Sequence, residues 1–477
     1  MKKIPIKVKE IPVEERVGSF KEVVLGYSEA EALLEAERCL QCKNPLCISG
    51  CPVGIDIKKF IYQISKKDYQ GAYYTIREKN NFPSICGRVC PAEYQCRKAC
   101  VLTKKGLPFA SPEAINIHFL ERFAGDWGME NLNSKFKIQN SKFADVKVAV
   151  VGSGPAGLCC AGELARVGVK VTIYESLHKP GGVLRYGIPT FRLPQEILDR
   201  EINYLKELGV EIITNTLIGK TKTIEEIFKE GYKAIFLGLG AGIPSLLNIK
   251  GENLGNIYSA NEFLTRVNLL FAYKFPDYHT PINVGKKIVV IGGGNTAMDA
   301  ARVALRLQVI NKLDPDVTLL YRRTEKEMPA RRLEITHAQE EGVKFRFLVQ
   351  PKEFVSDVCG FVKGIICLEC KLGEADSSGR PRSLPIPGSD FFIEADSVII
   401  AIGLRANQLL TRVTPQIKTD KYGNIIVEPQ TMETSLPAVF AGGDIVGGEG
   451  TIIEAMGMAK RAARSLLKKL KLARRKN

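Results

Sequence analysis

The spacing of apolar residues changes once along the chain. Up to about residue 128 they recur at helical intervals, and Ser28 with Glu31 forms a capping box that predicts a helix ending at the first two cysteines. Residues 55–80 and 111–128 predict further helical stretches. From Val146 onward, strands alternate with helices, and the polar segment 129–145 between the two parts predicts a linker.

The second part contains two segments with the pattern strand, glycine turn, helix, strand, over residues 146–175 and 286–323. Two such units in one chain predict two dinucleotide sites. Short apolar strands are expected at 234–240, 397–403 and 438–444, and a helix over 451–470. The predicted fold class is therefore α/β, with two Rossmann-like nucleotide-binding domains preceded by an all-α domain.

Composition is that of a globular protein, with 45% hydrophobic and 25% charged residues among 477. No apolar run is long enough for a transmembrane helix, and the first residues lack the apolar core of a signal peptide. These features predict a cytoplasmic protein without a membrane partner, where thiols stay reduced. Formal charge is 68 − 52 = +16. We expect the basic C-terminal segment to be a helix with cations at its negative end rather than a nucleic-acid-binding tail.

Eight of the thirteen cysteines lie in the first 100 residues, in two quartets. The first reads C-x2-C-x4-C-x3-C-P and comprises Cys39, Cys42, Cys47 and Cys51. The second reads C-x3-C-x5-C-x3-C and comprises Cys86, Cys90, Cys96 and Cys100. Short uneven loops can bring four thiolates to a [4Fe–4S] cubane, whereas zinc favours paired knuckles. The quartets favour two [4Fe–4S] clusters over a zinc site or inert thiols. The spacing does not show which cysteines share a cluster.

The first glycine loop, Gly152-x-Gly154-x-x-Gly157, follows a strand and opens a helix, and Glu175 closes the next strand. Such a loop receives a pyrophosphate at the helix N-terminus, and the acid accepts from a ribose hydroxyl. The second loop spans Gly292 to Ala297, and at the end of the strand that follows it Arg322 and Arg323 stand where that acid would be. A guanidinium binds a 2′-phosphate, so the second site is predicted to prefer NADP to NAD.

Together these motifs resemble the small (beta) subunit family of NADPH-dependent glutamate synthase over nearly the whole chain. The chain is similar also to the large subunit of NAD-dependent ferredoxin:NADP oxidoreductase, or sulfide dehydrogenase, and to the N-terminal half of dihydropyrimidine dehydrogenase. The matching segments are the two quartets, "VGSGPAG", "GGVLRYGIPTFRLP", "GGGNTAMD", "YRRTEKEMPARR" and "AGGD". One departure is "AIGLRAN", near Gly403, which lacks the proline that relatives carry before the asparagine.

The resemblance implies a helical iron–sulfur domain with its linker over 1–145, an FAD domain in two parts, 146–275 and 405–477, and an NADPH domain over 276–404. The implied FAD residues are Gly152, Gly154, Pro155, Ala156, Gly157, Glu175, Gly182, Arg192, Gly443, Asp444 and Thr451. The implied NADPH residues are Gly292, Gly294, Asn295, Thr296, Ala297, Arg322 and Arg323.

The family pattern also implies how the cysteines are shared. Cys39, Cys42, Cys47 and Cys100 would hold one cluster, and Cys51, Cys90 and Cys96 the other. The eighth ligand would be Cys86 on the glutamate synthase pattern, or Glu93 on the ferredoxin:NADP oxidoreductase pattern.

The expected function is electron transfer from NADPH through FAD and two [4Fe–4S] clusters to a redox partner, either a glutamate synthase large subunit or a ferredoxin reductase-like small subunit. The alternative is the large subunit of ferredoxin:NADP oxidoreductase. No catalytic acid or base is required for hydride transfer to a flavin, and none is assigned. The other hypotheses are a thiol redox centre, an iron–sulfur scaffold and a nucleic-acid-binding protein. The sequence contains no docking motif for nucleic acid.

Overall fold

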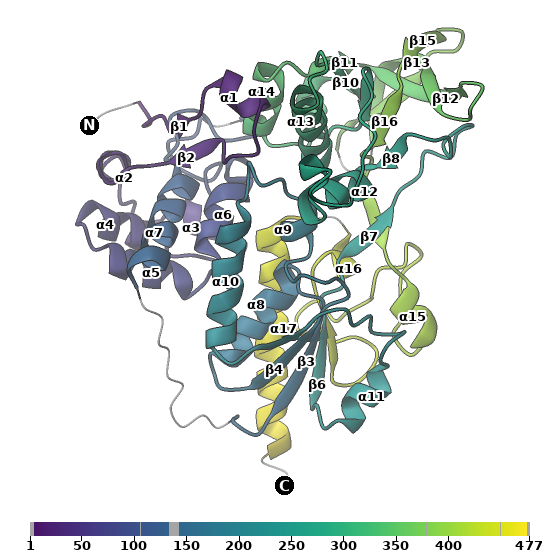
Figure 1. Ribbon diagram of the computed structural model, residues 1–477. Helices are drawn as coiled ribbons and strands as arrows, with labels where there is room; N and C mark the ends of the chain where they lie inside the picture. The colour runs from purple at the N-terminus through teal and green to yellow at the C-terminus, as the bar shows by residue number, and fades with distance from the viewer. Residues whose placement is uncertain (1–3, 105, 133–142, 377–378, 449, 475–477) are drawn as a thin grey trace.

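The computed structural model describes residues 4–104, 106–132, 143–376, 379–448 and 450–474. They form a helical N-terminal part, two parallel five-stranded sheets and a smaller antiparallel sheet (Figure 1). Residues 133–142 of the expected linker lie outside this range.

The N-terminal part is helical, as its apolar spacing predicts. Ser28 caps α2 with the predicted capping box, but the helix ends at Ala36, so Cys39 lies beyond a turn at residues 37–38. The stretch 55–80 contains two helices, because Lys67 adopts a left-handed φ of 60° and Asp68 caps the second helix. The elements are β1 (Lys9–Glu10), α1 (Val13–Val17), β2 (Val24–Gly26), α2 (Glu29–Ala36), α3 (Leu46–Ser49), α4 (Ile57–Ser65), α5 (Tyr69–Arg77), α6 (Pro83–Val89), η1 (Ala92–Tyr94) and α7 (Ile117–Asn131).

The first sheet has the strand order β18-β6-β3-β4-β5 and is parallel throughout. Its strands are β3 (Lys147–Val151), β4 (Lys170–Tyr174), β5 (Glu211–Ile213), β6 (Ala234–Leu237) and β18 (Val439–Ala441). Its helices are α8 (Pro155–Ala165), α9 (Val183–Tyr186), α10 (Gln195–Glu207), α11 (Ile224–Lys229), α16 (Asp444–Gly447) and α17 (Ile452–Arg474). In a parallel sheet the carboxyl ends share one edge, so the loops after β3, β4 and β18 meet there.

The second sheet has the order β11-β10-β9-β16-β8. Its strands are β8 (Ile257–Ser259), β9 (Ile288–Ile291), β10 (Val317–Tyr321), β11 (Lys344–Phe347) and β16 (Ser397–Ile400). Its helical elements are α12 (Ala260–Leu264), η2 (Thr265–Leu269), η3 (Ala272–Lys274), α13 (Asn295–Ile310), η4 (Glu325–Glu327) and α14 (Arg332–Glu340). The antiparallel sheet at the upper right of Figure 1 comprises β12 (Val349–Ser356), β13 (Val362–Ala375), β14 (Pro381–Pro385) and β15 (Phe391–Glu394).

The two parallel sheets are joined where β7 (Ala241–Pro244) pairs with β17 (Leu404–Ala406), and α15 (Leu409–Val413) follows. Strand β8 lies within the range 146–275 expected for the first part of the FAD domain, yet it pairs with β16 of the second sheet. Strand pairing therefore places residues 257–259 in the second sheet, whereas β7 lies between the two sheets. A half-buried strand of three residues has no apolar alternation from which a sequence could reveal its sheet.

Helices α8, α10 and α17 lie between the first sheet and the N-terminal part (Figure 1). Phe82 and Ile85 of α6 share one buried apolar cluster with Leu158 of α8 and Met456 of α17. A buried ion pair of 2.7 Å between Arg77 and Glu201 also joins α5 to α10. The cysteine-bearing part is therefore packed onto the first sheet through a shared core.

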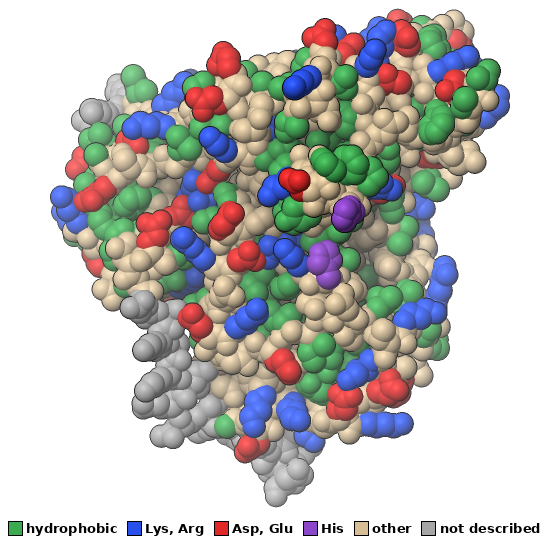
Figure 2. Space-filling view, in the orientation of Figure 1, with side chains coloured by type: hydrophobic (Ala, Val, Ile, Leu, Met, Phe, Trp, Pro, Cys, Tyr) green, Lys and Arg blue, Asp and Glu red, His purple; other side chains and the backbone are tan. Residues whose placement is uncertain are grey.

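The surface carries both signs of charge. Figure 2 shows basic and acidic side chains interspersed over the visible face, in spite of the formal charge of +16. Among the described residues, no helix combines the length and the apolar character that crossing a bilayer requires.

Candidate cofactor-binding and electron-transfer site

The first glycine loop connects β3 to α8, and its backbone approaches other backbone closely. A Cβ on Gly152 would lie 2.4 Å from the carbonyl oxygen of Gly238, and one on Gly157 would lie 1.9 Å from that of Gly152. A Cβ on Gly154 would meet nothing within 4 Å, so this glycine faces open space. The N-terminus of α8 is thus exposed to an approaching anion, which is the arrangement that binds a pyrophosphate.

Glu175, just after β4, is buried beside this loop. One carboxylate oxygen accepts from the Ser153 N–H at 2.9 Å and from the Ser153 hydroxyl. The other accepts from the Leu177 N–H at 2.8 Å. The carboxylate therefore holds the loops after β3 and β4 together, at the position from which an acid accepts from a ribose hydroxyl.

A cavity of about 480 Å³ opens at this edge of the first sheet. Its lining includes every residue expected for FAD except Gly157 and Arg192, namely Gly152, Gly154, Pro155, Ala156, Glu175, Gly182, Gly443, Asp444 and Thr451. Tyr186, which sequence reasoning missed, also lines it, and burial with the nearby Asp444 and Glu175 raises its pKa to about 12. A largely apolar cavity of this size with a few convergent polar groups fits a large organic cofactor.

Gly157 and Arg192 lie outside that lining. Gly157 is packed behind the loop, where only a hydrogen atom fits against the carbonyl oxygen of Gly152. The Arg192 side chain is 7% exposed, and its guanidinium lies 2.6 Å from Asp299 of α13 and 3.0 Å from Glu334 of α14. Through these ion pairs, Arg192 connects the part of the chain that contains the first sheet to the part that contains the second sheet.

The second glycine loop repeats the arrangement of the first. A Cβ on Gly292 would lie 2.2 Å from the carbonyl oxygen of Ala401, whereas one on Gly294 would meet nothing within 4 Å. Helix α13 starts at Asn295, followed by the exposed Thr296 and the buried Ala297. This loop also leaves a helix N-terminus open to a pyrophosphate.

The two arginines after β10 differ in their surroundings. Arg322 is exposed. Arg323 is buried and donates to the Asp376 carboxylate at 2.7 Å and to the Pro381 carbonyl at 2.6 Å. A guanidinium with these partners ties β10 to β14, whereas an exposed one can bind a phosphate.

Four thiols gather near the molecular surface. Cys39, Cys42, Cys47 and Cys100 line one small cavity together. Burial, together with the neighbouring Cys100, Cys39 and Cys42, raises the pKa of Cys47 to about 12. The distant Cys100 therefore joins three cysteines of the first quartet.

The other four thiols form the deeper cysteine group, in which Cys86 and Cys90 are buried and Cys51 and Cys96 are half-buried. Burial raises the pKa of Cys51 to about 11, with contributions from Glu121 and Cys90, and the pKa of Cys96 rises through burial, Cys51, Glu121 and Cys90. Cys86, one helical turn before Cys90, is fully buried. Two separate groups of four soft donors fit the ligand requirement of [4Fe–4S] cubanes.

Glu93 contacts two arginines. Its carboxylate accepts from the Arg332 N–H at 3.2 Å and lies 3.7 Å from Arg331 Nε. Cys86 Sγ instead lies 3.6 Å from Asn80 Oδ1 and 3.9 Å from Met456 Sδ.

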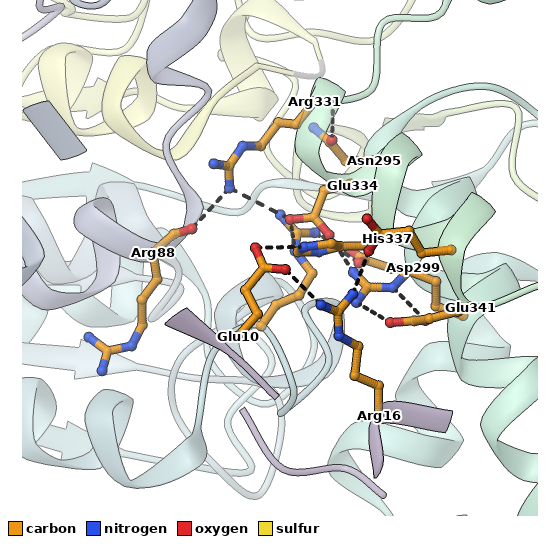
Figure 3. A network of polar contacts seen from close by, with 12 residues as sticks. Glu10, Arg16, Arg88, Asn295, Asp299, Arg331, Glu334, His337 and Glu341 are labelled. Atoms are coloured by element: carbon orange, nitrogen blue, oxygen red, sulfur yellow. Dashed lines mark hydrogen bonds and ion pairs between the residues drawn. The ribbon is translucent and has the colours of Figure 1, made fainter. Parts of the chain in front are cut away.

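A buried network of ion pairs, drawn in Figure 3, connects the N-terminal part with α13 and α14. Glu341 binds Arg302 at 2.8 Å and Arg306 at 2.7 Å, and Glu334 binds Arg302 at 2.5 Å. Sequence reasoning missed this network, because Arg302 and Arg306 lie 32 to 39 residues along the chain from the glutamates that they bind. His337, Glu10 and Glu340 also approach one another within 4.8 Å. Arg16 binds both of those carboxylates at 2.6 and 2.7 Å, which makes this an ion-pair cluster and not a metal site.

Comparisons with known proteins agree with this geometry. Residues 16–133 match the family model for dihydropyrimidine dehydrogenase domain II, 4Fe-4S cluster. Residues 146–462 match that for pyridine nucleotide-disulphide oxidoreductase. The fold is similar to that of FprA from Mycobacterium tuberculosis in complex with NADPH, with a TM-score of 0.57 and 22% identity, over 69% of this chain and 86% of that one.

Curated relatives extend the likeness over nearly the whole chain. The glutamate synthase [NADPH] small chain of Escherichia coli is 33% identical over 98% of this chain and 95% of its own length. The NADP(+)-dependent formate dehydrogenase subunit beta of Moorella thermoacetica is 37% identical over 88% of this chain, which spans 59% of that protein. The NADPH-Fe(3+) oxidoreductase subunit beta of Geobacter sulfurreducens is 36% identical over 95% of this chain and 68% of its own length.

The cofactors of this chain are FAD, NADPH and [4Fe–4S], as the matched domains and relatives indicate and as the loops, cavity and thiols fit. The chain therefore belongs to the glutamate synthase small-chain family of NADPH-dependent iron–sulfur flavoprotein oxidoreductases.

Proposed function

We propose that this chain delivers electrons from NADPH to a partner subunit, a glutamate synthase large chain, in a reducing compartment such as the cytoplasm. When bound, FAD accepts the electron pair of NADPH, and two [4Fe–4S] clusters carry electrons one at a time. The chain's own residues bind the two nucleotides, hold the clusters and present one of them to the partner.

The observation that carries the proposal is the contact between the deeper cysteine group and the flavin cavity. Gln95, next to Cys96, donates to Thr451 Oγ1 at 3.3 Å, and Thr451 lines the cavity. Pro52, next to Cys51, lines an adjoining cavity of about 280 Å³ together with Asp444. These contacts support a role for the deeper group as the cluster site nearest the flavin.

The shallower cysteine group is suited to electron exit. Exposed apolar side chains surround it: Leu46 is 55% exposed, Val101 49% and Leu40 42%. Apolar side chains exposed together at one place are typical of a surface that another protein covers. We therefore propose that the partner docks over Leu40, Leu46 and Val101.

On the nucleotide side, the exposed Arg322 supports a preference for NADPH, because an exposed guanidinium can bind the 2′-phosphate. Arg323 would have to leave Asp376 to do so, and we therefore assign the phosphate contact to Arg322.

The surroundings of Glu93 favour this function over that of a ferredoxin:NADP oxidoreductase large subunit. The latter pattern uses a glutamate as the eighth cluster ligand, and here the Glu93 carboxylate contacts Arg331 and Arg332. Cys86, on the glutamate synthase pattern, is the thiol we propose as that ligand.

Anaerobic reduction of the reconstituted chain tests the proposal. We expect NADPH to bleach the flavin and to produce the EPR signals of two reduced clusters, and NADH to do so more slowly. Adding a glutamate synthase large chain with glutamine and 2-oxoglutarate should start NADPH oxidation. A flavin that stays oxidised in NADPH, or a partner that elicits no turnover, would contradict the proposal.

Leu46→Glu examines the docking surface. It should slow turnover with the partner at least tenfold and leave flavin bleaching unchanged, because a charge would then be buried in the interface. Val358→Glu is the matched control, since Val358 is fully exposed on the distant loop between β12 and β13. Equal effects of both variants would argue against this docking surface.

A further inference from the structure

Arg331 belongs to the segment "MPARR", which the proposed function leaves without a role. It immediately precedes α14, and it is among the largest fully buried side chains, with 2% of its surface exposed. A guanidinium remains charged in proteins. The molecule therefore holds a permanent positive charge in its interior at this point.

The backbone around Arg331 is fixed to the second glycine loop. The Arg331 N–H donates to Asn295 Oδ1 at 2.8 Å, and the Ala330 N–H donates to the Gly293 carbonyl at 3.2 Å. Figure 3 shows Asn295 directly beside the Arg331 backbone. The position of Arg331 therefore depends on the loop that we expect to bind NADPH.

The side chain of Arg331 points the other way, into the cysteine-bearing part. Its Nη1 donates to the Arg88 carbonyl at 2.9 Å, two residues before Cys90 (Figure 3). The hydroxyl of Tyr94, four residues after Cys90 in the sequence, donates to the Ala330 carbonyl at 3.1 Å. The guanidinium is thus held against the polypeptide that carries the deeper cysteine group.

The charge of Arg331 is incompletely neutralised. Among the described residues, its nearest carboxylates, Glu93 and Glu334, each lie 3.7 Å away, and its Nε has no hydrogen-bond partner. Glu334 has closer partners in Arg302 at 2.5 Å and Arg192 at 3.0 Å. Arg331 therefore contributes a positive potential beside Cys90.

We propose that Arg331 raises the reduction potential of the cluster held by Cys51, Cys86, Cys90 and Cys96. One-electron reduction makes the cluster more negative by one charge, and a buried cation nearby stabilises that form with little screening by salt. Net charge near a cluster is one of the means by which a protein sets its potential. The inference rests on the proposed second cluster.

An EPR-monitored redox titration of the full chain carrying Arg331→Gln tests this role. We expect the equilibrium constant for reduction of one cluster to fall at least tenfold, a 59 mV lower potential for one electron, while the other cluster is unchanged. Arg331→Lys retains the charge and should restore most of the shift. NADP⁺ affinity should change little in both, because the backbone N–H that binds Asn295 remains.

Arg332→Gln is the matched control, since it removes the same charge from a side chain that is 27% exposed, and it should leave both potentials unchanged. Glu334→Gln removes a neighbouring negative charge and should raise the potential that Arg331→Gln lowers. Loss of packing alone would not lower the potential in Arg331→Gln and raise it in Glu334→Gln. If Arg331→Gln loses iron, the potential measured in Glu334→Gln tests the inference by itself.

Wild-type potentials in both Arg331→Gln and Glu334→Gln, with the flavin still reduced by NADPH, would overturn the inference and leave the proposed function standing. A wild-type chain with one cluster signal, or one that NADPH does not reduce, would overturn the proposed function and this inference with it.

Discussion

Cys86 and Glu93 lie on either side of Cys90 in the sequence, and their surroundings predict different roles for them. Cys86 is buried on α6, Cys90 follows that helix as its C-cap residue, and the two thiols contact each other. The Glu93 carboxylate accepts a backbone N–H and lies near a buried guanidinium. Removing that carboxylate from its partners to bind iron would leave a buried charge unpaired, which costs several kcal/mol.

We therefore expect Cys86→Ala to lower the iron content from about eight to about four atoms per chain, since each cubane holds four irons. Glu93→Gln should retain iron. Cys159→Ala, which removes another fully buried thiol from α8, serves as the control. Iron and acid-labile sulfide analysis of the purified chains measures the effect, and half-loss in Glu93→Gln alone would assign the ligand to Glu93.

At the scale of elements, each glycine loop combines two kinds of glycine. One kind is packed against backbone and permits the strand and the helix to approach each other, as Gly157 does. The other kind faces open space and leaves room for a ligand, as Gly154 and Gly294 do. The loop is thus both a packing joint and a binding surface, and the two functions can be separated by substitution.

Gly154→Ala should raise the dissociation constant for FAD at least tenfold with little change in the thermal midpoint of the flavin-free chain. The added methyl group would stand where the pyrophosphate is expected, and the φ of −72° at Gly154 suits alanine. Gly157→Ala should instead destabilise the chain by about 1–3 kcal/mol, because its Cβ would overlap the Gly152 carbonyl oxygen. Flavin fluorescence and thermal unfolding measure the two quantities. Equal loss of stability in both variants would contradict this division.

Across the whole molecule, buried ion pairs join parts that are distant in sequence. Arg192 of the first sheet's part reaches Asp299 and Glu334 in the second, and Arg306 donates to the Ser19 carbonyl of the N-terminal part. Directional contacts of this kind hold the two nucleotide sites and the cysteine-bearing part in one fixed arrangement. Electron transfer benefits from such rigidity, because productive transfer depends on positioning.

Glu341 offers a test of the network by pH. Burial alone would raise its pKa, but Arg302 and Arg306 outweigh burial and lower the pKa to about 2. An acid with a depressed pKa stabilises the folded chain above its unfolded pKa of 4.5, and this stabilisation is lost as the pH falls from 4.5 toward 2. Glu341→Gln should therefore cost about 3–5 kcal/mol at pH 7 and much less near pH 3.

The urea midpoint of unfolding at the two pH values measures this difference. Glu340→Gln is the control, because Glu340 is 44% exposed and pairs with Arg16 at the rim of the network. A Glu341→Gln deficit that is the same at pH 7 and near pH 3 would show that the charge is not what stabilises the network.

The sequence by itself determined the parts whose signals are local. Residues close together in the chain predict the capping box at Ser28, both glycine loops with their strands, and helix α17. The structure confirms these elements. Local hydrogen bonding, sterics and apolar periodicity act over a few residues, so a sequence displays them directly.

Only the tertiary structure decided what depends on distant partners. In the folded chain Cys100 lies near Cys39, and Arg192 and Arg323 form ion pairs. Strand β8 pairs within the second sheet, and Arg331 lies beside Cys90. A thiol, a guanidinium or a three-residue strand has the same local sequence whichever partner it meets. The partner is chosen by packing and electrostatics between segments that the chain order keeps apart.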